Sequence, residues 1–375
     1  MRIPLASPEV TEADIEAVSR VLRSTQLSLG PKLPEFERAM ADYVGAEHAV
    51  AVNSGTSGLH LCVRALGIGE GDEVILPSYT FIAVANAIRM ERATPVFVDI
   101  DPVTLNLDPD KVEAAITPRT RAMMVVHTFG RPAEMAPLLG IAKRHGLRII
   151  EDACEAIGAE YRGKKVGPIG DAGVFAFYPN KQITTGEGGM IVTQHARIAA
   201  AARAMRNQGR GNPDRGQWLE HTDVGYNYRL SEMQCALGIE QLRRIEDILA
   251  RRAAIAGWYD RFLQGHPDLL LPALAVNDCR LSWFVYVVRL SERFSREDRD
   301  AIVRTLAAQG IGCGRYFAPI HLQPAYRDLL PLRESLAITE SAGERCVALP
   351  FFNRITIAQV QEVCDALQAA LLEQK

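Results

Sequence analysis

Short apolar segments alternate with amphipathic, helix-like segments through the first two thirds of the sequence, and this alternation restricts the fold more than any other feature. Strands separated by helices at this spacing form a mainly parallel sheet with helices on both faces. The sequence therefore predicts an α/β fold. The predicted strands cover residues 49–52, 73–76, 96–100, 122–126, 147–150, 173–177 and 190–193, and the predicted helices cover 57–66, 81–92, 109–116 and 133–145.

The last third of the sequence has a different pattern. A long helical pattern over 231–263 ends before Gly265, Pro267 and Pro272. Because closely spaced glycine and proline residues interrupt regular structure, we expect a domain boundary there. The expected units are a large α/β domain over residues 1–264 and a smaller α+β domain over residues 265–375. In the smaller unit the predicted strands are 283–290 and 312–317, and the predicted helices are 296–309, 334–346 and 356–372.

The overall composition excludes several classes of partner. With 42 basic and 45 acidic residues the net charge is −3, so we expect neither nucleic acid nor an anionic membrane as a partner. The seven cysteines are scattered and never in C-x-x-C spacing, which predicts reduced thiols and no metal site. The sequence has no apolar segment typical of a signal peptide or a membrane span. We expect a cytoplasmic protein.

Two charged positions are candidates for chemistry. Asp152 follows the predicted strand 147–150, and ligands bind at the carboxyl ends of strands in open α/β sheets; the plainer interpretation is an acid that caps a helix. Lys181 lies between two apolar strands beside a glycine-rich turn, although a loop lysine is usually a solvated charge. Close backbone approach at these glycines favours a pocket, where burial lowers the pKa of a lysine as imine chemistry requires.

A turn of small residues, Ser54 to Ser57, precedes the predicted helix 57–66. Free N–H groups at a helix start bind phosphate, although such turns are common. No Walker A or G-x-G-x-x-G motif follows a strand, which argues against ATP and NAD. An acid, a lysine and a phosphate cradle on one sheet are what pyridoxal 5'-phosphate chemistry requires.

Several motifs in order along nearly the whole chain resemble the DegT/DnrJ/EryC1/StrS sugar aminotransferases, a branch of the pyridoxal-phosphate enzymes of fold type I. The resemblance implies that fold, with a mainly parallel sheet, and a homodimer with shared active sites. The motifs are Gly30-Pro31 with Phe36-Glu37, Asn53-Ser54-Gly55-Thr56, Pro77-Ser78-Tyr79-Thr80-Phe81, Glu151-Asp152-Ala153, Lys181 with its glycine-rich turn, Gly225-Tyr226-Asn227-Tyr228-Arg229-Leu230 and His321-Leu322-Gln323-Pro324.

The resemblance also implies a role for each matching residue. Lys181 holds the cofactor as a Schiff base and moves a proton, and Asp152 pairs with the pyridine nitrogen. Phe81 stacks on the ring, for which core packing is the alternative interpretation, and His321 has a structural histidine as its alternative. Gly55, Thr56 and Ser57 bind the phosphate, and Asn227 reaches the same phosphate from the second subunit. Glu155 lies beside the cofactor 3-hydroxyl. The substrate is bound by Arg229, Tyr316, His321 and Glu187.

Two positions depart from the pattern of the family. Members usually carry a serine that binds the phosphate where this chain has Ala176, five residues before Lys181. A hydrogen bond to a charged group contributes about 1.5–3 kcal/mol, so we expect weaker cofactor retention, or compensation by water or by Thr185. The second departure is Glu155, where many members carry glutamine; an ionised carboxylate there would alter the pKa of the imine.

The turn 183–189 resembles that of members that aminate carbon 4 (C4) of 4-keto-6-deoxy sugars. The implied reaction transfers an amino group from L-glutamate to C4 of a nucleotide-linked keto sugar, for surface polysaccharide or glycoconjugate synthesis. Amination at C3 and amination of a cyclitol are alternatives from the same class. A sugar dehydratase of this fold carries histidine in place of the lysine, and Lys181 argues against it. A non-catalytic regulatory protein that keeps the fold is the alternative from another class.

Overall fold

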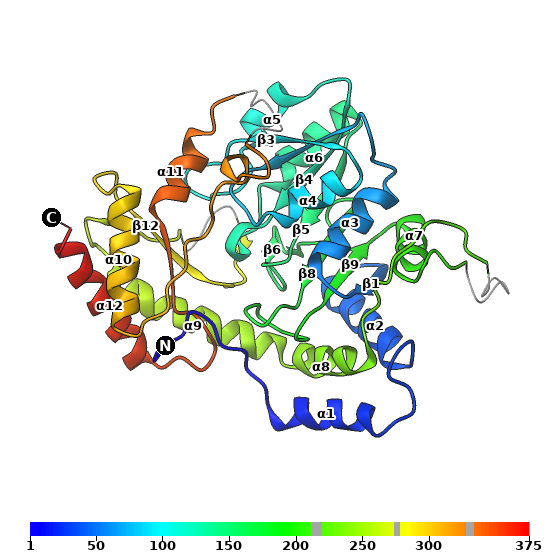
Figure 1. Cartoon of the computed structure of the whole chain (residues 1–375), viewed down its shortest axis with the longest axis horizontal. Helices are drawn as coiled ribbons and strands as arrows, with labels where there is room; N and C mark the ends of the chain where they lie inside the picture. Colours follow the sequence, from blue (N-terminus) through cyan, green and yellow to red (C-terminus); the bar gives the residue numbers. More distant parts are fainter. Residues whose placement is uncertain (212–219, 274–277, 328–333, 375) are drawn as a thin grey trace.

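A seven-stranded sheet forms the centre of the molecule (Figure 1). The computed structural model describes residues 1–211, 220–273, 278–327 and 334–374. The strand order is β1-β9-β8-β5-β4-β2-β3, with parallel pairing from β8 to β3 and antiparallel pairing of β9 with β8 and β1. The mainly parallel α/β sheet is therefore confirmed. The strands are β1 (His48–Val52), β2 (Glu73–Pro77), β3 (Thr94–Val98), β4 (Thr120–Val126), β5 (Arg148–Asp152), β8 (Ala172–Ala176) and β9 (Gly189–Thr193).

Helices cover both faces of this sheet because its strands are apolar on both sides. Successive side chains of a strand point to opposite faces, and in β2 Ile75 belongs to one buried cluster while Val74 and Leu76 belong to the other. One face packs against α3 (Gly55–Ala65), α4 (Ala83–Met90) and α7 (Ala196–Arg206). The other face packs against α2 (Lys32–Val44), α5 (Pro109–Ala115), α6 (Met135–His145) and α8 (Glu232–Arg243).

A third apolar cluster forms around a three-stranded antiparallel sheet of β10 (Leu269–Leu270), β12 (Tyr286–Leu290) and β13 (Cys346–Leu349). Helices α10 (Arg296–Ala308) and α12 (Ile357–Leu372) pack on it, together with the second half of α9 (Ile245–Leu263). Ile3 also lies in this cluster. The boundary between residues 264 and 265 stays a prediction, and α9 contributes to the clusters on both sides of it.

The remaining elements lie at the periphery. Helix α1 (Glu12–Leu22) packs on α8, and α11 (Ala337–Arg345) precedes β13. Among the described residues, no helix has the length and apolar composition needed to cross a membrane. The third sheet consists of β6 (Glu160–Tyr161), β7 (Lys164–Lys165) and β11 (Cys279–Arg280).

Two of the predicted elements are wrong. The helical pattern over 231–263 forms two helices, because Arg244 leaves the helical conformation, with φ −104° and ψ 10°, and its Nη2 donates to Asp14 Oδ2 at 2.8 Å. The strand expected over 312–317 is not formed. Its backbone divides between partners, since Gly312 N donates to Ile3 O at 2.8 Å while Gly314 pairs with Ala348.

Candidate active site

A cavity of about 400 Å³ lies where β4 and β5 end and α3 begins. This is the carboxyl edge of the parallel strands, where open α/β sheets bind ligands. Eight of the residues expected at the site line this cavity: Gly55, Thr56, Phe81, Asp152, Glu155, Lys181, Glu187 and Tyr316.

The two acids at the end of β5 have different surroundings because neighbouring strand residues face opposite sides. Glu151 is fully buried and accepts hydrogen bonds from Gly167 N at 2.8 Å and Gly170 N at 2.6 Å, so it holds a loop. Asp152 lines the cavity, and its Oδ1 accepts a bond from Cys154 N at 3.1 Å. Of these two acids, Asp152 alone presents its carboxylate to the cavity.

Lys181 is held by a carboxylate and an aromatic ring. Its Nζ lies 3.3 Å from Glu155 Oε1 and 4.0 Å from the centroid of the Phe284 ring. Glu155 Oε2 also accepts a hydrogen bond from Phe129 N at 2.9 Å. Burial raises the pKa of Glu155 above its usual value, against the opposing effect of the Lys181 charge. The amine therefore has a fixed position in the cavity wall.

The start of α3 supplies free backbone donors. Ser54 caps the helix by accepting from Ser57 N at 3.0 Å, and Ser57 Oγ donates to Asn53 Oδ1 at 2.7 Å. The N–H groups of Gly55 and Thr56 belong to the first turn and have no partner within the helix. Both residues line the cavity, whereas Ser57 does not. The phosphate role expected of Ser57 therefore stays a prediction, with its N–H and hydroxyl already engaged in the cap.

Phe81 and Tyr316 form aromatic walls. Phe81 is 60 % exposed, so the alternative of core packing does not describe it. Tyr316 stacks on Phe317 at 5.1 Å between ring centroids, and burial raises the pKa of its hydroxyl. Glu187 lies at the cavity edge and is exposed.

Besides Ser57, three expected site residues do not line the cavity. Asn227 is exposed, and Arg229 Nη1 donates to Asn207 Oδ1 at 2.9 Å. His321 is buried, with Nδ1 at 2.7 Å from Ser78 Oγ and Nε2 at 3.3 Å from Glu340 Oε1. These contacts suit the structural histidine weighed above, and the substrate roles of His321 and Arg229 stay predictions.

Ala176 lines the cavity directly beside the start of α3. A Cβ placed on Gly55 would lie 2.8 Å from the Ala176 Cβ, so the two backbones are as close as small residues allow. Thr185, expected to compensate for the missing serine, does not line the cavity, and its hydroxyl donates to Glu187 O at 2.7 Å. That hydroxyl proton is not available to a phosphate.

Several cavity residues were not expected from the sequence. Phe284 and Phe317 come from the chain after residue 265, far from Lys181 in sequence, and no local pattern links them to it. Asn180 could have been found from its place beside Lys181. Its buried Oδ1 has no hydrogen-bond partner and therefore leaves an acceptor for a ligand.

The residues present fit pyridoxal phosphate. The free N–H groups at the start of α3 suit a phosphate, and substitution at Gly55 would close this part of the cavity. Asp152 suits a protonated ring nitrogen, and Lys181 suits an aldehyde. The fold and the site together define a pyridoxal-phosphate-dependent transferase of fold type I.

Comparisons with known proteins agree with this class. The family model described as "DegT/DnrJ/EryC1/StrS aminotransferase family" matches residues 8–368. GDP-perosamine synthase of Caulobacter vibrioides is 44% identical over 373 residues, covering 99% of both chains. The solved structure of DesV of S. venezuelae, in complex with a ketimine intermediate, has a TM-score of 0.88 and 40% identity over 95% of this chain and 94% of its own.

A third structure is the PLP form of the sugar aminotransferase Spr1654 of Streptococcus pneumoniae, which its description calls putative. It has a TM-score of 0.94 and 28% identity, with both chains fully covered. The chain therefore belongs to the DegT/DnrJ/EryC1/StrS aminotransferase family. It is a pyridoxal-phosphate-dependent aminotransferase.

Proposed function

We propose that this enzyme transfers an amino group from L-glutamate to C4 of a nucleotide-linked 4-keto-6-deoxy sugar. The observation that carries the proposal is the single cavity that Lys181, Asp152 and the start of α3 share. The similarity to a GDP-perosamine synthase over 99% of both chains supports a nucleotide sugar as the acceptor. The sequence of the turn 183–189 supports C4 as the position.

Each residue of the cavity has a role in the reaction that follows from its chemistry. Pyridoxal phosphate, when bound, supplies an electron sink for the carbon that gains or loses a proton. The Asp152 carboxylate holds the proton on the ring nitrogen, and the N–H groups of Gly55 and Thr56 bind the phosphate. Lys181 Nζ would hold the cofactor, and its amine would carry the proton as a general base and acid.

Glu155 and the aromatic residues position Lys181. The contacts of Nζ with Glu155 and with the Phe284 ring restrict where the amine can lie. A positioned proton-transfer group contributes roughly 10²–10⁴-fold to rate, and misplacement removes much of that gain. Phe81, which also lines the cavity, provides an apolar face for a ring and keeps water from it.

The assembly we propose is a homodimer in which each subunit completes the partner's site. Asn227 is exposed and lies outside its own cavity, which supports a contact with the phosphate held by a second subunit. Substrate is held by Tyr316 and Glu187 at the cavity and by Arg229 and His321 beyond it.

The test is a product analysis. The holoenzyme is incubated with L-glutamate and a panel of 4-keto-6-deoxy sugars linked to GDP, UDP or dTDP. NMR of the product is expected to show a new amine on C4 of one sugar and an equal amount of 2-oxoglutarate. Reactions without glutamate are the control. An amine on C3, or no amine with any sugar of the panel, contradicts the proposal.

A further inference from the structure

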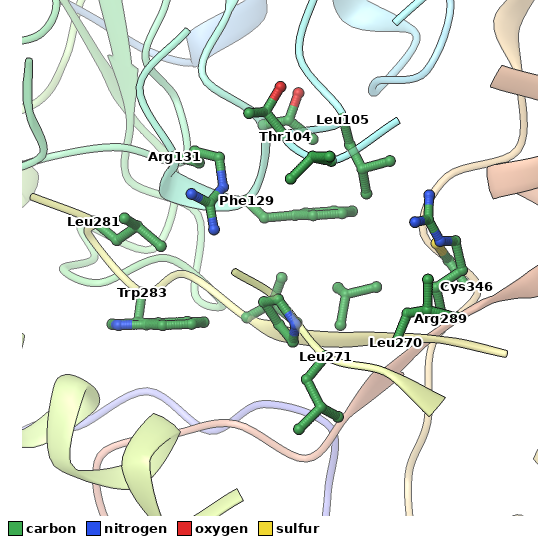
Figure 2. A pocket seen from close by; sticks show the side chains of 15 residues that line it. Thr104, Leu105, Phe129, Arg131, Leu270, Leu271, Leu281, Trp283, Arg289 and Cys346 are labelled. Atoms are coloured by element: carbon green, nitrogen blue, oxygen red, sulfur yellow. The ribbon is translucent and has the colours of Figure 1, made fainter. Parts of the chain in front are cut away.

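A second cavity lies between the large sheet and the three-stranded sheet, and Figure 2 shows its walls. It encloses about 60 Å³ of free space. A single water molecule needs roughly 10–15 Å³ on this measure, so the cavity holds several water-sized groups. None of its lining residues lines the cofactor cavity. The two cavities are therefore separate.

Arg131 places a buried positive charge at this cavity. The residue is 6 % exposed, and its Nη1 is buried without a hydrogen-bond partner. Its Nη2 donates to Ala273 O, a neutral acceptor. Figure 2 shows the guanidinium pointing between Phe129 and Trp283, into the cavity.

Within the described ranges, no carboxylate forms an ion pair with Arg131. The stretch between Ala273 and Asp278 contains no acidic residue that could supply one. Burying a charge is costly unless it is paired and hydrogen-bonded. The Asp101 carboxylate acts on this guanidinium only through space, and no carboxylate of the described residues contacts it directly.

Two further groups make the cavity suited to an anion. Thr128, from the loop after β4, has a buried hydroxyl without a hydrogen-bond partner, and it lines the same cavity. Arg289, on β12, lies on the opposite side in Figure 2, and its Nη1 donates to a neutral acceptor, Pro102 O, at 2.8 Å. Both arginines thus face the cavity without an ion pair among the described residues.

Most of the remaining wall is apolar, and the hydroxyl of Thr104, which also lines the cavity, donates to Asp101 Oδ1 at 2.8 Å. Leucine, proline, valine and aromatic side chains surround the polar groups, so the ligand must combine an anionic end with a short hydrocarbon body. The apolar lining residues are Val103, Leu105, Phe129, Leu270, Leu271, Pro272, Leu281, Trp283, Val285 and Val287.

We propose that this cavity binds a small organic carboxylate, with its carboxyl group on Arg131 and Thr128. The guanidinium fork matches a carboxylate with two parallel hydrogen bonds. Phe129 lines this second cavity and also contacts two residues of the cofactor cavity. Its N–H donates to Glu155, and its ring stacks on Phe317 at 5.3 Å between centroids. The proposal concerns a site outside the cofactor cavity and does not depend on the identity of the sugar substrate.

Trp283 provides a direct probe because it lines the cavity and the chain has only three tryptophans. Replacing Trp258 and Trp218, the latter outside the described residues, by phenylalanine leaves Trp283 as the sole reporter. The holoenzyme carrying these changes is titrated with succinate at constant ionic strength and, in parallel, with uncharged succinamide. Succinate is expected to change the emission of Trp283 in a saturable way, and succinamide is not.

Variants separate this site from the catalytic one. Arg131→Gln is expected to weaken succinate binding at least about tenfold, as loss of a charged hydrogen-bond pair implies. Arg131→Lys, which keeps the charge, is expected to recover part of the affinity. Thr128→Val keeps the shape and removes the hydroxyl, so it is expected to weaken binding without disturbing the fold. Arg92→Gln, at an exposed arginine remote from the cavity, is the matched control and is expected to leave binding unchanged.

Three outcomes overturn the proposal. They are the absence of a saturable response to succinate, an equal response to succinamide, and affinity unchanged in both Arg131→Gln and Thr128→Val. If Arg131→Gln does not fold, Thr128→Val and Arg131→Lys decide the question. Failure here leaves the aminotransferase assignment untouched, because product formation at the other cavity is measured separately.

Discussion

Glu155 shows how one side chain ties the cofactor cavity together. Its two carboxylate oxygens contact Lys181 Nζ and Phe129 N, while its own backbone carbonyl accepts Gln182 Nε2 at 2.7 Å. Burial raises the pKa of the carboxyl even though the lysine charge opposes the rise. Glu155 thus positions the Lys181 amine, and its burial lowers the free energy of unfolding by an amount that depends on pH.

The pH dependence of stability tests this position in the cofactor-free protein. A folded-state pKa above the usual 4.5 means that the folded protein binds more protons than the unfolded protein, so Glu155 costs stability as pH rises through that interval. Each unit of pKa corresponds to about 1.4 kcal/mol. Glu155→Gln is therefore expected to gain stability relative to the unmodified protein as pH rises from about 4.5 towards neutrality. Denaturant unfolding at several pH values measures the difference.

Glu246→Gln is the matched control for this experiment. The hydrogen bond with Arg280 lowers the pKa of Glu246, so this carboxylate stabilises the fold above its unfolded pKa and loses that effect as pH falls. Its variant is expected to lose stability relative to the unmodified protein as pH rises, the opposite sign. A stability difference for Glu155→Gln that stays constant with pH would refute the account of Glu155.

For single residues, the sequence predicts a place in the active site only where the residue belongs to a local motif. Asp152 at a strand end and Lys181 beside a glycine-rich turn could be found because each follows an apolar strand. Phe284 could not, because its approach to Lys181 depends on how β12 packs against the large sheet. The Glu155 side chain was expected near the cofactor, while its contact with Lys181 appears only in the structure.

Helix α3 is the element that we propose binds the phosphate. Two residues of its first turn, whose N–H groups have no partner within the helix, line the cavity, and Gly55 lets this turn approach Ala176 and Cys154. A Cβ on Gly55 would lie 2.8 Å from Ala176 Cβ and 2.9 Å from Cys154 Sγ. Because the Ala176 Cβ is fixed to the backbone and cannot rotate away, the helix start would have to move.

Gly55→Ala is accordingly expected to weaken cofactor binding by about tenfold or more and to destabilise the protein by roughly 1–3 kcal/mol through overpacking. Titration of the cofactor-free protein with pyridoxal phosphate, followed by absorbance, measures the first effect. Gly257→Ala in α9, where no atom lies within 4 Å of the added Cβ, is the control. It is expected to bind the cofactor normally and to gain about 0.5–1 kcal/mol from helix propensity. Equal cofactor affinity in both variants would contradict the role of α3.

Helices and strands were predicted correctly where a local sequence pattern determines them. The prediction was wrong where a partner distant in the sequence determines the backbone conformation. The strands of the large sheet follow from their apolar runs because both faces are covered. The run 312–317 has a strand pattern as well, but its partners are Ile3 and Ala348, far away in the chain. The break between α8 and α9 likewise coincides with a contact from Arg244 to Asp14, which the local helical pattern does not contain.

At the scale of the whole molecule, residues of the large sheet and residues of the chain beyond position 265 meet around the two cavities described above. The large sheet contributes Lys181, Asp152 and the start of α3, whereas Phe284, Tyr316 and Phe317 come from the chain beyond residue 265. The sequence predicted the large sheet and the class of the enzyme. It could not predict the second cavity, because Arg131 and Arg289 are 158 positions apart and neither stands in a motif.

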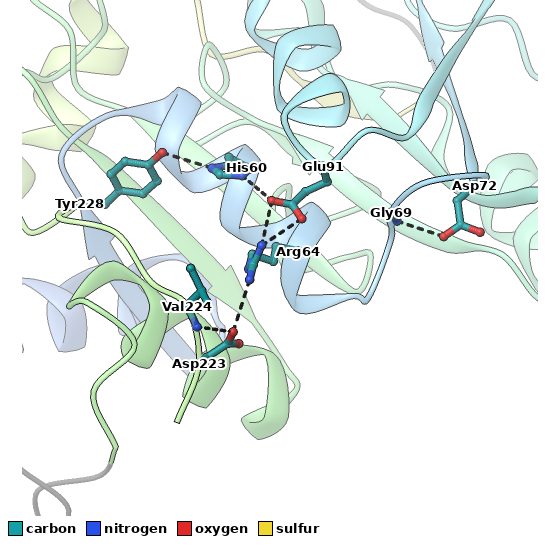
Figure 3. A network of polar contacts seen from close by, with 8 residues as sticks. All are labelled: His60, Arg64, Gly69, Asp72, Glu91, Asp223, Val224 and Tyr228. Carbon is teal, nitrogen blue, oxygen red and sulfur yellow. Dashed lines mark hydrogen bonds and ion pairs between the residues drawn. The ribbon is translucent and has the colours of Figure 1, made fainter. Parts of the chain in front are cut away.

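The figures also show a polar network that ties α3 to the segment carrying Asn227. Figure 3 shows Glu91 bonded to His60, at 2.7 Å, and to Arg64, which also reaches Asp223. His60 Nδ1 lies 3.3 Å from the Tyr228 hydroxyl. The helix proposed to bind the phosphate and the segment expected to reach a partner subunit are therefore fixed to each other within one chain.

We propose that Lys181 is the residue that transfers the proton during turnover by this aminotransferase. Lys181→Ala is expected to lower turnover with glutamate and the keto sugar by more than about 100-fold, because general base and acid catalysis is lost. Lys143→Ala, at an exposed lysine of α6, is the control and is expected to keep full activity. Single-turnover measurement of 2-oxoglutarate release by both variants loaded with cofactor is the most direct test. Near-complete loss confined to Lys181→Ala is the predicted result, and transamination by that variant at a rate comparable to the control would contradict the account.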